Sequence, residues 1–465
     1  MLRLTTPLVA LTLAVSVLAP ANAAPLSDGR SAPVEDSYYP SKGDPGVDAL
    51  HYGLDLTWLK KRRVLKGVAR ITLRATANDN HFQLDLGDPL RVRSVHVNGR
   101  RAGFRHPGKT LRVSRKVVRN HRYRVRIVYR GTPRPTRAPT TRRDMSRVGW
   151  STTRNGQVWT MQEPFGAFTW YPSNDQPSDK ALYDVRISAP GRWVGVSNGQ
   201  LRQRRYAKGR TVTRWRLDQP ASTYLMTIAI GPYTQHRQRG PHGIPMSYWV
   251  PTNRPGLVKP LMRTPAAMRW LERRLGRYPF DRVGVVLVPS DSAMETQEMV
   301  TFGIGNYDFG PTTVQDIMVH ELAHHWYGNT VTPRDWRDVW MNEGMATYLE
   351  ARWTVKQGDF TWRNHQRYWR RSDQQFRNRY GPPGRYNPGM FAESNVYYSA
   401  ALMLDELRQS LGDARFNRLM RQWPQTHRDS NQSRASYVAW LEARTGKNLD
   451  PFFEKWLMSR TSPVV

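Results

Sequence analysis

Two histidines and a glutamate in the second half of the chain have the residue types and spacing of a metal site. His320 and His324 stand four positions apart in the segment HELAHHWYGN. On a helix their directions differ by about 40°, so both imidazoles can reach one ion. Glu321 follows the first histidine and can accept a proton from a water on the open side of that ion.

A third ligand follows at Glu343, with 18 residues between it and His324, in the helical segment WMNEGMATYLE. Two histidines and one carboxylate leave a fourth tetrahedral position for water. The pattern therefore predicts a catalytic Zn²⁺ with His320, His324 and Glu343 as ligands, and Glu321 as general base. His325 points roughly 100° away from its neighbour and is excluded. The alternative is that Glu343 caps a helix and the histidines are ordinary surface residues.

Basic residues outnumber acidic ones by 71 to 37, and the formal net charge is +34. They occur as short pairs along the chain, such as Arg62-Arg63 and Arg370-Arg371, with no basic tail or recognised nucleic-acid motif. We therefore predict no nucleic-acid partner. Electrostatic contact with anionic cell-wall polymers is one interpretation of the charge, and a solvated arginine-rich surface is the other.

The first residues have the pattern of a secretory signal peptide. Arg3 precedes an apolar run, and Ala21-Asn22-Ala23 supplies the small residues of a cleavage site. The run is too short for an ordinary membrane span. We predict a signal peptide over residues 1–23, removed near Ala23, and a secreted protein, with an N-terminal membrane anchor as the alternative. Because the chain has no cysteine, its stability must come from core burial.

The sequence pattern changes from strands to helices along the chain. Residues 24–37 are small and polar, which predicts a disordered lead-in. Over residues 38–235, alternating segments such as 123–129 and the turn signal Asn98-Gly99 predict strands and hairpins. Over residues 236–465, helical periodicity prevails. We therefore predict an α+β chain with an N-terminal β domain and a mainly helical second domain.

The segments around the metal site resemble the aminopeptidase N-like family of zinc metallopeptidases, the gluzincins. The resemblance implies a saddle-shaped, β-sandwich-like domain packed on a thermolysin-like, mainly helical catalytic domain. Because the chain ends soon after its last shared segment, we expect no large C-terminal helical domain, as in short secreted actinobacterial members. Besides HELAHHWYGN and WMNEGMATYLE, the shared segments are YYPSKGDPGVDALHYGLDL (38–56), WYPSNDQPSDKALYDV (170–185), TYLMTIAIGPY (223–233) and LDPFFEKWL (449–457).

The same resemblance implies a substrate-binding segment. The family's Gly-Ala-Met-Glu-Asn segment matches Ser-Ala-Met-Glu-Thr at residues 292–296. In the family the glutamate of this segment binds the free α-amine of the substrate, so Glu295 is expected to do so, with Ala293 and Met294 beside the substrate. A negative group is the natural partner of an ammonium. The alternative is a loop carboxylate without that role.

Two further residues are implied. The family's Gln-x-Glu-Pro element lines the first substrate pocket, and Glu163-Pro164 matches it with the glutamine one place nearer, at Gln162. A turn role for Glu163 is the alternative. A family tyrosine that donates to the oxyanion matches Tyr397 by spacing, with Tyr398 as the fallback. A buried core aromatic is the alternative for Tyr397.

These residues predict a monomeric, secreted zinc metallopeptidase that removes N-terminal residues from peptides, with one Zn²⁺ per chain. Two other functions stay open. A thermolysin-like endopeptidase would use the same zinc and base without Glu295 as amine anchor, and it would cleave peptides whose N-terminus is blocked. A non-catalytic, arginine-rich cell-surface binding protein would be indifferent to chelation.

Overall fold

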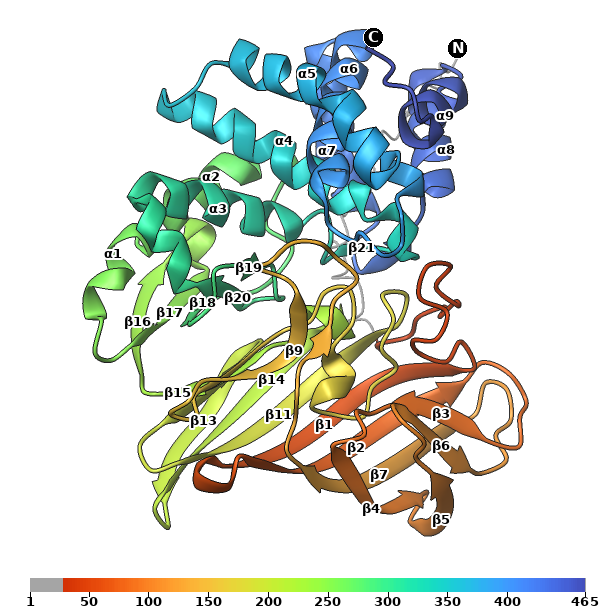
Figure 1. Cartoon of the computed structure of the whole chain (residues 1–465), viewed down its shortest axis with the longest axis vertical. Helices are drawn as coiled ribbons and strands as arrows, with labels where there is room; N and C mark the ends of the chain where they lie inside the picture. The colour runs from red at the N-terminus through yellow and green to blue at the C-terminus, as the bar shows by residue number, and fades with distance from the viewer. Residues whose placement is uncertain (1–27, 465) are drawn as a thin grey trace, which may run out of the picture.

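The computed structural model describes residues 28–464, and Figure 1 shows its sheets in the lower part of the molecule and most of its helices above them. Strands make up the first half of the chain, and helices prevail in the second. The predicted α+β architecture, with the β-rich part first, is therefore confirmed. The predicted signal peptide, residues 1–23, lies outside the described residues.

A ten-stranded sheet is the largest layer of the first half. Its strand order is β13 (Gln200–Ala207), β14 (Arg210–Ser222), β11 (Lys180–Pro190), β1 (Val47–Leu59), β2 (Val64–Ala75), β7 (Arg122–Gly131), β4 (Leu90–Val97), β5 (Arg100–Arg105), β6 (Thr110–Ser114) and β3 (Phe82–Asp85). In β7 the inward residues Tyr123, Val125 and Ile127 are buried and the arginines between them are exposed, as the alternation predicted. The predicted turn between β4 and β5 is confirmed, with φ of 50° at Asn98 and 79° at Gly99.

A five-stranded sheet packs against the inner face of the first. Its order is β12 (Val194–Ser197), β15 (Ile228–Gly231), β10 (Val158–Met161), β9 (Arg147–Thr152) and β8 (Thr136–Arg137). Trp58 of β1 meets Trp150 of β9 between the layers, with ring centroids 5.2 Å apart, and both are fully buried. Large aromatic side chains thus supply core area that holds two sheets together without disulfides.

A second five-stranded sheet begins the other half of the molecule. Its order is β16 (Tyr233–Arg239), β17 (Pro245–Pro251), β18 (Val283–Val288), β20 (Val300–Gly303) and β19 (Ala293–Met294). All six residues of β18 are buried, as the apolar run there predicted. The chain passes into this sheet between Gly231 and Tyr233, so the boundary predicted after residue 235 falls inside β16.

Helices complete the second half, and α1 to α3 lie over the sheet that β16 begins (Figure 1). Their bounds are α1 (Val258–Leu261), α2 (Thr264–Leu275), α3 (Pro311–His324), α4 (Trp340–Gln357), α5 (Trp362–Tyr380), the π-helical turn η9 (Asn395–Ser399), α6 (Ala400–Leu411), α7 (Asp413–Thr426), α8 (Arg434–Thr445) and α9 (Asp450–Met458). A short parallel pair, β21 (Val331–Pro333) and β22 (Ser430–Gln432), ties the turn after α3 to the C-terminal helices.

The lead-in predicted to be disordered is ordered from Asp28 onward. The Ser31 N–H donates to Asp48 Oδ1 at 3.0 Å, and the Val34 N–H donates to the Ser178 hydroxyl at 3.0 Å. The buried Asp36 carboxylate accepts the N–H of Trp336 at 2.7 Å. Through its backbone and the Asp36 side chain, the segment makes hydrogen bonds to both halves of the molecule.

The N-terminal half also holds the end of α3. The Lys180 ammonium donates to the Asn329 and Thr330 carbonyls at 2.9 and 3.0 Å, and the Tyr224 hydroxyl donates to the Gly328 carbonyl at 2.9 Å. All of these groups are buried, and burial lowers the pKa of Lys180 to about 7. The turn that follows the His-Glu-x-x-His helix is therefore fixed from across the domain junction.

Helices α4 and α6 approach closely at Gly344, the residue after Glu343. A methyl group on Gly344 would lie 2.6 Å from the Ala400 Cβ, which is well inside van der Waals contact. Both residues are buried, and neither has a flexible side chain that could turn aside. Because residue 344 has no side chain, α4 can lie close against α6, and this close packing fixes the position of Glu343.

We expect Gly344→Ala to lower the free energy of unfolding by about 1–2 kcal/mol, because overpacking outweighs the gain in helix propensity of about 1 kcal/mol. Urea unfolding followed by tryptophan fluorescence measures the change. Adding Ala400→Gly should relieve the contact, so the two substitutions should couple by at least about 1 kcal/mol. A Gly344→Ala variant as stable as the wild type would contradict the close approach of residue 344 to Ala400.

Candidate metal centre and active site

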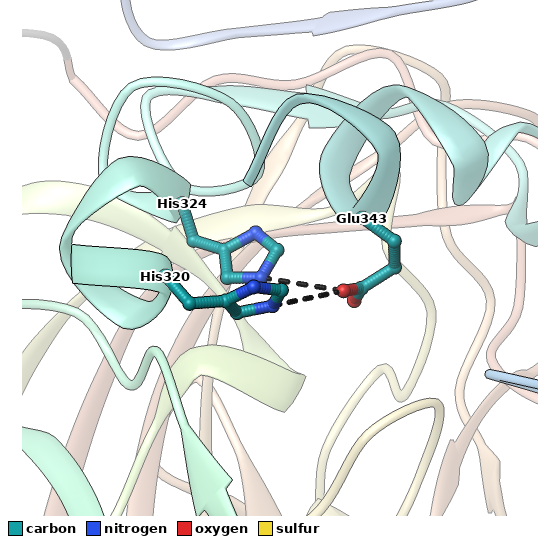
Figure 2. A group of neighbouring side chains, drawn as sticks. All are labelled: His320, His324 and Glu343. Carbon is teal, nitrogen blue, oxygen red and sulfur yellow. Dashed lines mark hydrogen bonds and ion pairs between the residues drawn. The ribbon is translucent and has the colours of Figure 1, made fainter. Parts of the chain in front are cut away.

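Helices α3 and α4 pack together and bring His320, His324 and Glu343 to one point (Figure 2). The Glu343 Oε2 atom lies 3.3 Å from His320 Nε2 and 3.4 Å from His324 Nε2. One donor atom from each residue lies within 4.8 Å of the other two. The predicted ligand triad is therefore assembled.

The donor set and its spacing fit zinc. Two atoms that each lie about 2.0–2.1 Å from a tetrahedral centre are about 3.3 Å apart, which matches the observed nitrogen–oxygen separations. Two imidazoles and one carboxylate are also the ligands of a zinc site that keeps a fourth position open. The three residues thus form a zinc-binding triad.

The outer nitrogen of each histidine has a partner of its own. His320 Nδ1 lies 2.9 Å from Glu350 Oε2, and His324 Nδ1 lies 3.2 Å from the Tyr327 carbonyl. These contacts direct both Nε2 atoms at the metal position. Sequence reasoning left these partners unidentified, although Glu350 follows Glu343 by seven residues and so shares its face of α4.

The charges of the triad depend on one another. Burial acts to raise the pKa of Glu343, but His324 and His320 outweigh burial and lower that pKa. Burial acts to lower the pKa of His320, but Glu343 and Glu350 outweigh it and raise that pKa well above its usual value. Glu343 therefore stays anionic and able to bind a cation.

Glu321 lies on α3 beside the triad and lines the cavity into which the ligands open. Its carboxyl is buried, and burial raises its pKa to about 8, against the opposing effect of His320 and His324. A carboxyl with a pKa near neutral can both take up and return a proton. The position agrees with the role of general base that the motif predicted.

The cavity has a volume of about 400 Å³, and two further carboxylates enter it. Glu295 and Glu163 are each buried, and the Oε1 atom of each has no hydrogen-bond partner within residues 28–464. Burial raises the pKa of both, and for Glu163 the neighbouring Glu295 adds to the effect. An unpaired buried carboxylate is costly, so these two oxygens are acceptors that lack a donor among the described residues.

The other residues of the substrate segments are placed differently. Ala293 lines the cavity, but Met294 does not, because its sulfur turns toward the Gln162 N–H, 3.4 Å away. The Gln162 amide is committed to the Thr223 and Met226 carbonyls at 2.8 and 2.6 Å. Gln162 thus holds the irregular segment after β10 that carries Glu163.

Tyr397 lies in η9 with its ring stacked beside His320 at a centroid distance of 6.0 Å. Its hydroxyl accepts a hydrogen bond of 3.0 Å from Arg142 Nη1. A phenol that accepts from one side keeps its own proton free to donate, and Tyr397 lines the cavity. Tyr398, the fallback, also lines the cavity, and its ring packs on Tyr368 and Phe376.

Arg142 was not found by sequence reasoning, because it lies in a loop of the N-terminal half and meets Tyr397 255 residues later in the chain. Asp144 orients its guanidinium through two hydrogen bonds of 3.2 and 2.6 Å. The loop is fixed by Glu393, whose Oε1 accepts from the Thr141 N–H at 2.8 Å and the Thr141 hydroxyl at 2.6 Å. No sequence pattern signals such a contact between distant loops.

The sequence-based expectation for His325 also has an outcome. His325 is buried away from the triad, with Nδ1 2.7 Å from the Tyr278 hydroxyl, as its direction on the helix predicted. The exposed arginines of α5 do not line the active-site cavity. Positive charge at the cavity comes from Arg142 instead.

Comparison with known proteins agrees with this geometry. The M1 zinc metallopeptidase of Deinococcus radiodurans superimposes with a TM-score of 0.80 at 27% identity, over 93% of this chain and 98% of that one. Human glutamyl aminopeptidase is 27% identical over 43% of this chain, and Aminopeptidase M1 of Arabidopsis thaliana is 24% identical over 66%. This chain spans only 22% and 37% of their respective lengths.

Family models cover most of both halves of the chain. The Peptidase M1 N-terminal domain matches residues 48–225, and the Peptidase family M1 domain matches residues 261–456, which include every member of the zinc-binding triad. The resemblance drawn from the motifs is thereby confirmed, and the chain belongs to peptidase family M1.

Proposed function

We propose that this protein is a zinc-dependent aminopeptidase that removes N-terminal residues from peptides and acts as a monomer. The observation that carries the proposal is the pair of buried, unpartnered carboxylate oxygens of Glu163 and Glu295 in the cavity beside the triad. A free α-ammonium offers three N–H donors and a positive charge. It can therefore donate hydrogen bonds to both oxygens and balance their negative charge.

The residues of the cavity have complementary parts in the reaction. When bound by His320, His324 and Glu343, zinc supplies a Lewis acid that lowers the pKa of water and polarises a carbonyl. Glu321 takes the proton from the attacking water and returns it to the leaving amine. The hydroxyl of Tyr397 donates to the oxygen that becomes negative as the carbonyl is attacked.

The alternative of an endopeptidase fits the cavity less well. A peptide that continued past the scissile bond on its N-terminal side would bring a neutral amide, not an ammonium, to Glu163 and Glu295. The two carboxylates would then stay buried without a counter-charge, which costs free energy on binding. A point mutant of the M1 zinc metallopeptidase from Deinococcus radiodurans has been solved with a Tyr-Ser-Ala substrate, and a point mutant of a two-domain M1 zinc metallopeptidase has been solved with L-arginine. Both structures support short peptides as ligands here.

The proposal is tested with free-amine peptides and their N-acetylated twins. We expect stepwise trimming of the free peptides, no cleavage of the acetylated ones, and loss of activity on zinc chelation. Glu295→Gln should lower kcat/KM for free peptides about 100-fold, since a charged hydrogen bond contributes about 1.5–3 kcal/mol.

Glu321→Gln is the matched control, because it should lower kcat while zinc binding and peptide binding persist. Internal cleavage of acetylated peptides, with Glu295→Gln as active as the wild type, would identify an endopeptidase and remove the proposed role of Glu295.

Arg142 is expected to act through Tyr397. We expect Arg142→Ala to lower kcat by about 10-fold with little change in KM, and Tyr397→Phe to lower it by about 100-fold or more. If Arg142 serves to orient the hydroxyl, adding Arg142→Ala to Tyr397→Phe should cost nothing further. Steady-state kinetics of the four proteins measure this coupling.

Two variants control for a general effect on the loop. Arg143→Ala removes the neighbouring arginine, whose side chain is exposed, and should leave kcat unchanged. Arg142→Lys keeps a cationic donor and should recover part of the activity. Losses that multiply in the double variant would show that Arg142 acts elsewhere than on Tyr397.

We also propose that the protein is exported. The charged start, short apolar run and Ala-x-Ala site of residues 1–23 support this. Across residues 28–464, no helix combines the length and apolar character needed to cross a bilayer.

Mass spectrometry of the protein from an expressing culture tests export. We expect it in the medium with an N-terminus at Ala24, and Ala23→Asp should block its processing, because a charged residue disrupts the cleavage site. Full-length protein held in the membrane fraction would instead support the N-terminal anchor.

A further inference from the structure

Three neighbouring strands of the ten-stranded sheet present basic side chains on one exposed face. Strands β2, β7 and β4 contain no Asp or Glu, and their inward residues are apolar and buried. We call the outward set the basic face: Lys66 and Arg70 of β2, Arg124, Arg126 and Arg130 of β7, and Arg91 of β4.

The strand register sets these like charges against one another. Arg70 lies opposite Arg126, and Lys66 lies opposite Arg130. On the other side of β7, Arg130 also lies opposite Arg91. Directly opposed residues have Cβ atoms about 4.5–5.5 Å apart, and like charges at that separation destabilise a sheet.

No member of the basic face has a carboxylate partner among residues 28–464. Two neighbouring arginines on the same sheet do find partners: Arg74 pairs with Asp48 at 2.8 Å, and Arg186 pairs with Asp55 at 2.7 Å. The sheet can therefore neutralise its arginines where acidic residues are provided. The basic face has no such acidic partner, so only solvent or an external anion can reduce the repulsion between its charges.

The spacing of the charges suits an extended anionic chain. Neighbouring strands lie about 4.8 Å apart, and residues on the same face of one strand lie about 7 Å apart. One row across the strands holds Arg91, Arg130 and Lys66, and a second holds Arg126 and Arg70. Uncharged Val128 and Val68 separate the two rows, so a linear polymer would meet these cations in two groups. Five of the six members are arginine, whose planar guanidinium binds the oxygens of a phosphate in pairs.

The face lacks the groups that would recognise nucleic-acid bases. No Phe, Tyr or Trp is exposed on these three strands, because Tyr123 and Tyr129 point inward and are buried. Proteins that bind single-stranded nucleic acids combine positive charge with aromatic side chains on which bases stack. The basic face offers only the charge.

We propose that the basic face binds a flexible linear polymer that carries a phosphate in each repeat and no bases. None of the six residues lines the active-site cavity, and the three strands lie on the side of the molecule away from the helices (Figure 1). A bound polymer would therefore hold the protein in place while the cavity stays open. The proposal does not depend on the proposed peptidase activity.

The test uses long-chain inorganic polyphosphate as the probe, with binding measured by fluorescence anisotropy at several salt concentrations. We expect Arg70→Gln/Arg124→Gln/Arg126→Gln to weaken binding by about 10-fold to 100-fold and to reduce the log–log salt slope by about 2, because each phosphate contact in a single strand releases about 0.7 counterion. Polyphosphate should also raise the melting temperature of the wild type more than that of the variant.

The matched control removes three exposed arginines of α5, as Arg363→Gln/Arg367→Gln/Arg371→Gln, for the same change in net charge. Equal loss of binding in both variants would mean that net charge alone attracts the polymer, and the proposal would fail. Tighter binding of single-stranded DNA than of polyphosphate, at equal phosphate concentration, would assign the face to nucleic acid and also overturn it. Hydrolysis of small peptides should be unchanged in both variants, so folding is monitored independently.

Discussion

Mutual repulsion among buried carboxylates is the constraint on which the active site depends. Glu163, Glu295, Glu321 and Glu343 share one cavity, and burial raises the pKa of the first three. At Glu343 the two histidines outweigh burial and lower the pKa. Such a cavity is stabilised when cations enter it, so a metal ion and a substrate ammonium are each favoured by the same excess of negative charge.

The parts of the fold and of the active site that could be predicted from the sequence are those whose interacting residues are related by a local pattern. The triad was predicted because helix geometry relates His320 to His324 and the pattern of α4 marks Glu343. Arg142 was not, since its contact with Tyr397 joins a loop of one domain to the helical turn η9 of the other, and no periodicity encodes it. The order of residues 28–37 was not predicted for the same reason, because the Asp36 carboxylate accepts its hydrogen bond from Trp336, which is distant in the sequence.

Charge is distributed unevenly between the cavity and the outer surface. The whole chain carries +34, yet the cavity beside the metal site is rich in carboxylates. At physiological salt the outer charge is screened beyond about 8 Å, so it acts on large anionic partners at contact, whereas buried carboxylates act on the end of a small ligand with little screening. The two charged regions can thus select different molecules independently.

The loop that carries Arg142 has a consequence for biogenesis. Thr141 and Glu393 fasten it to the helical half, yet the loop itself belongs to the half that a ribosome completes first. A helical half that folded alone would already possess its metal ligands, but the phenol of Tyr397 would lack the guanidinium that directs its proton. Full turnover would therefore begin only once the two halves have docked, because the guanidinium and the phenol come from different halves.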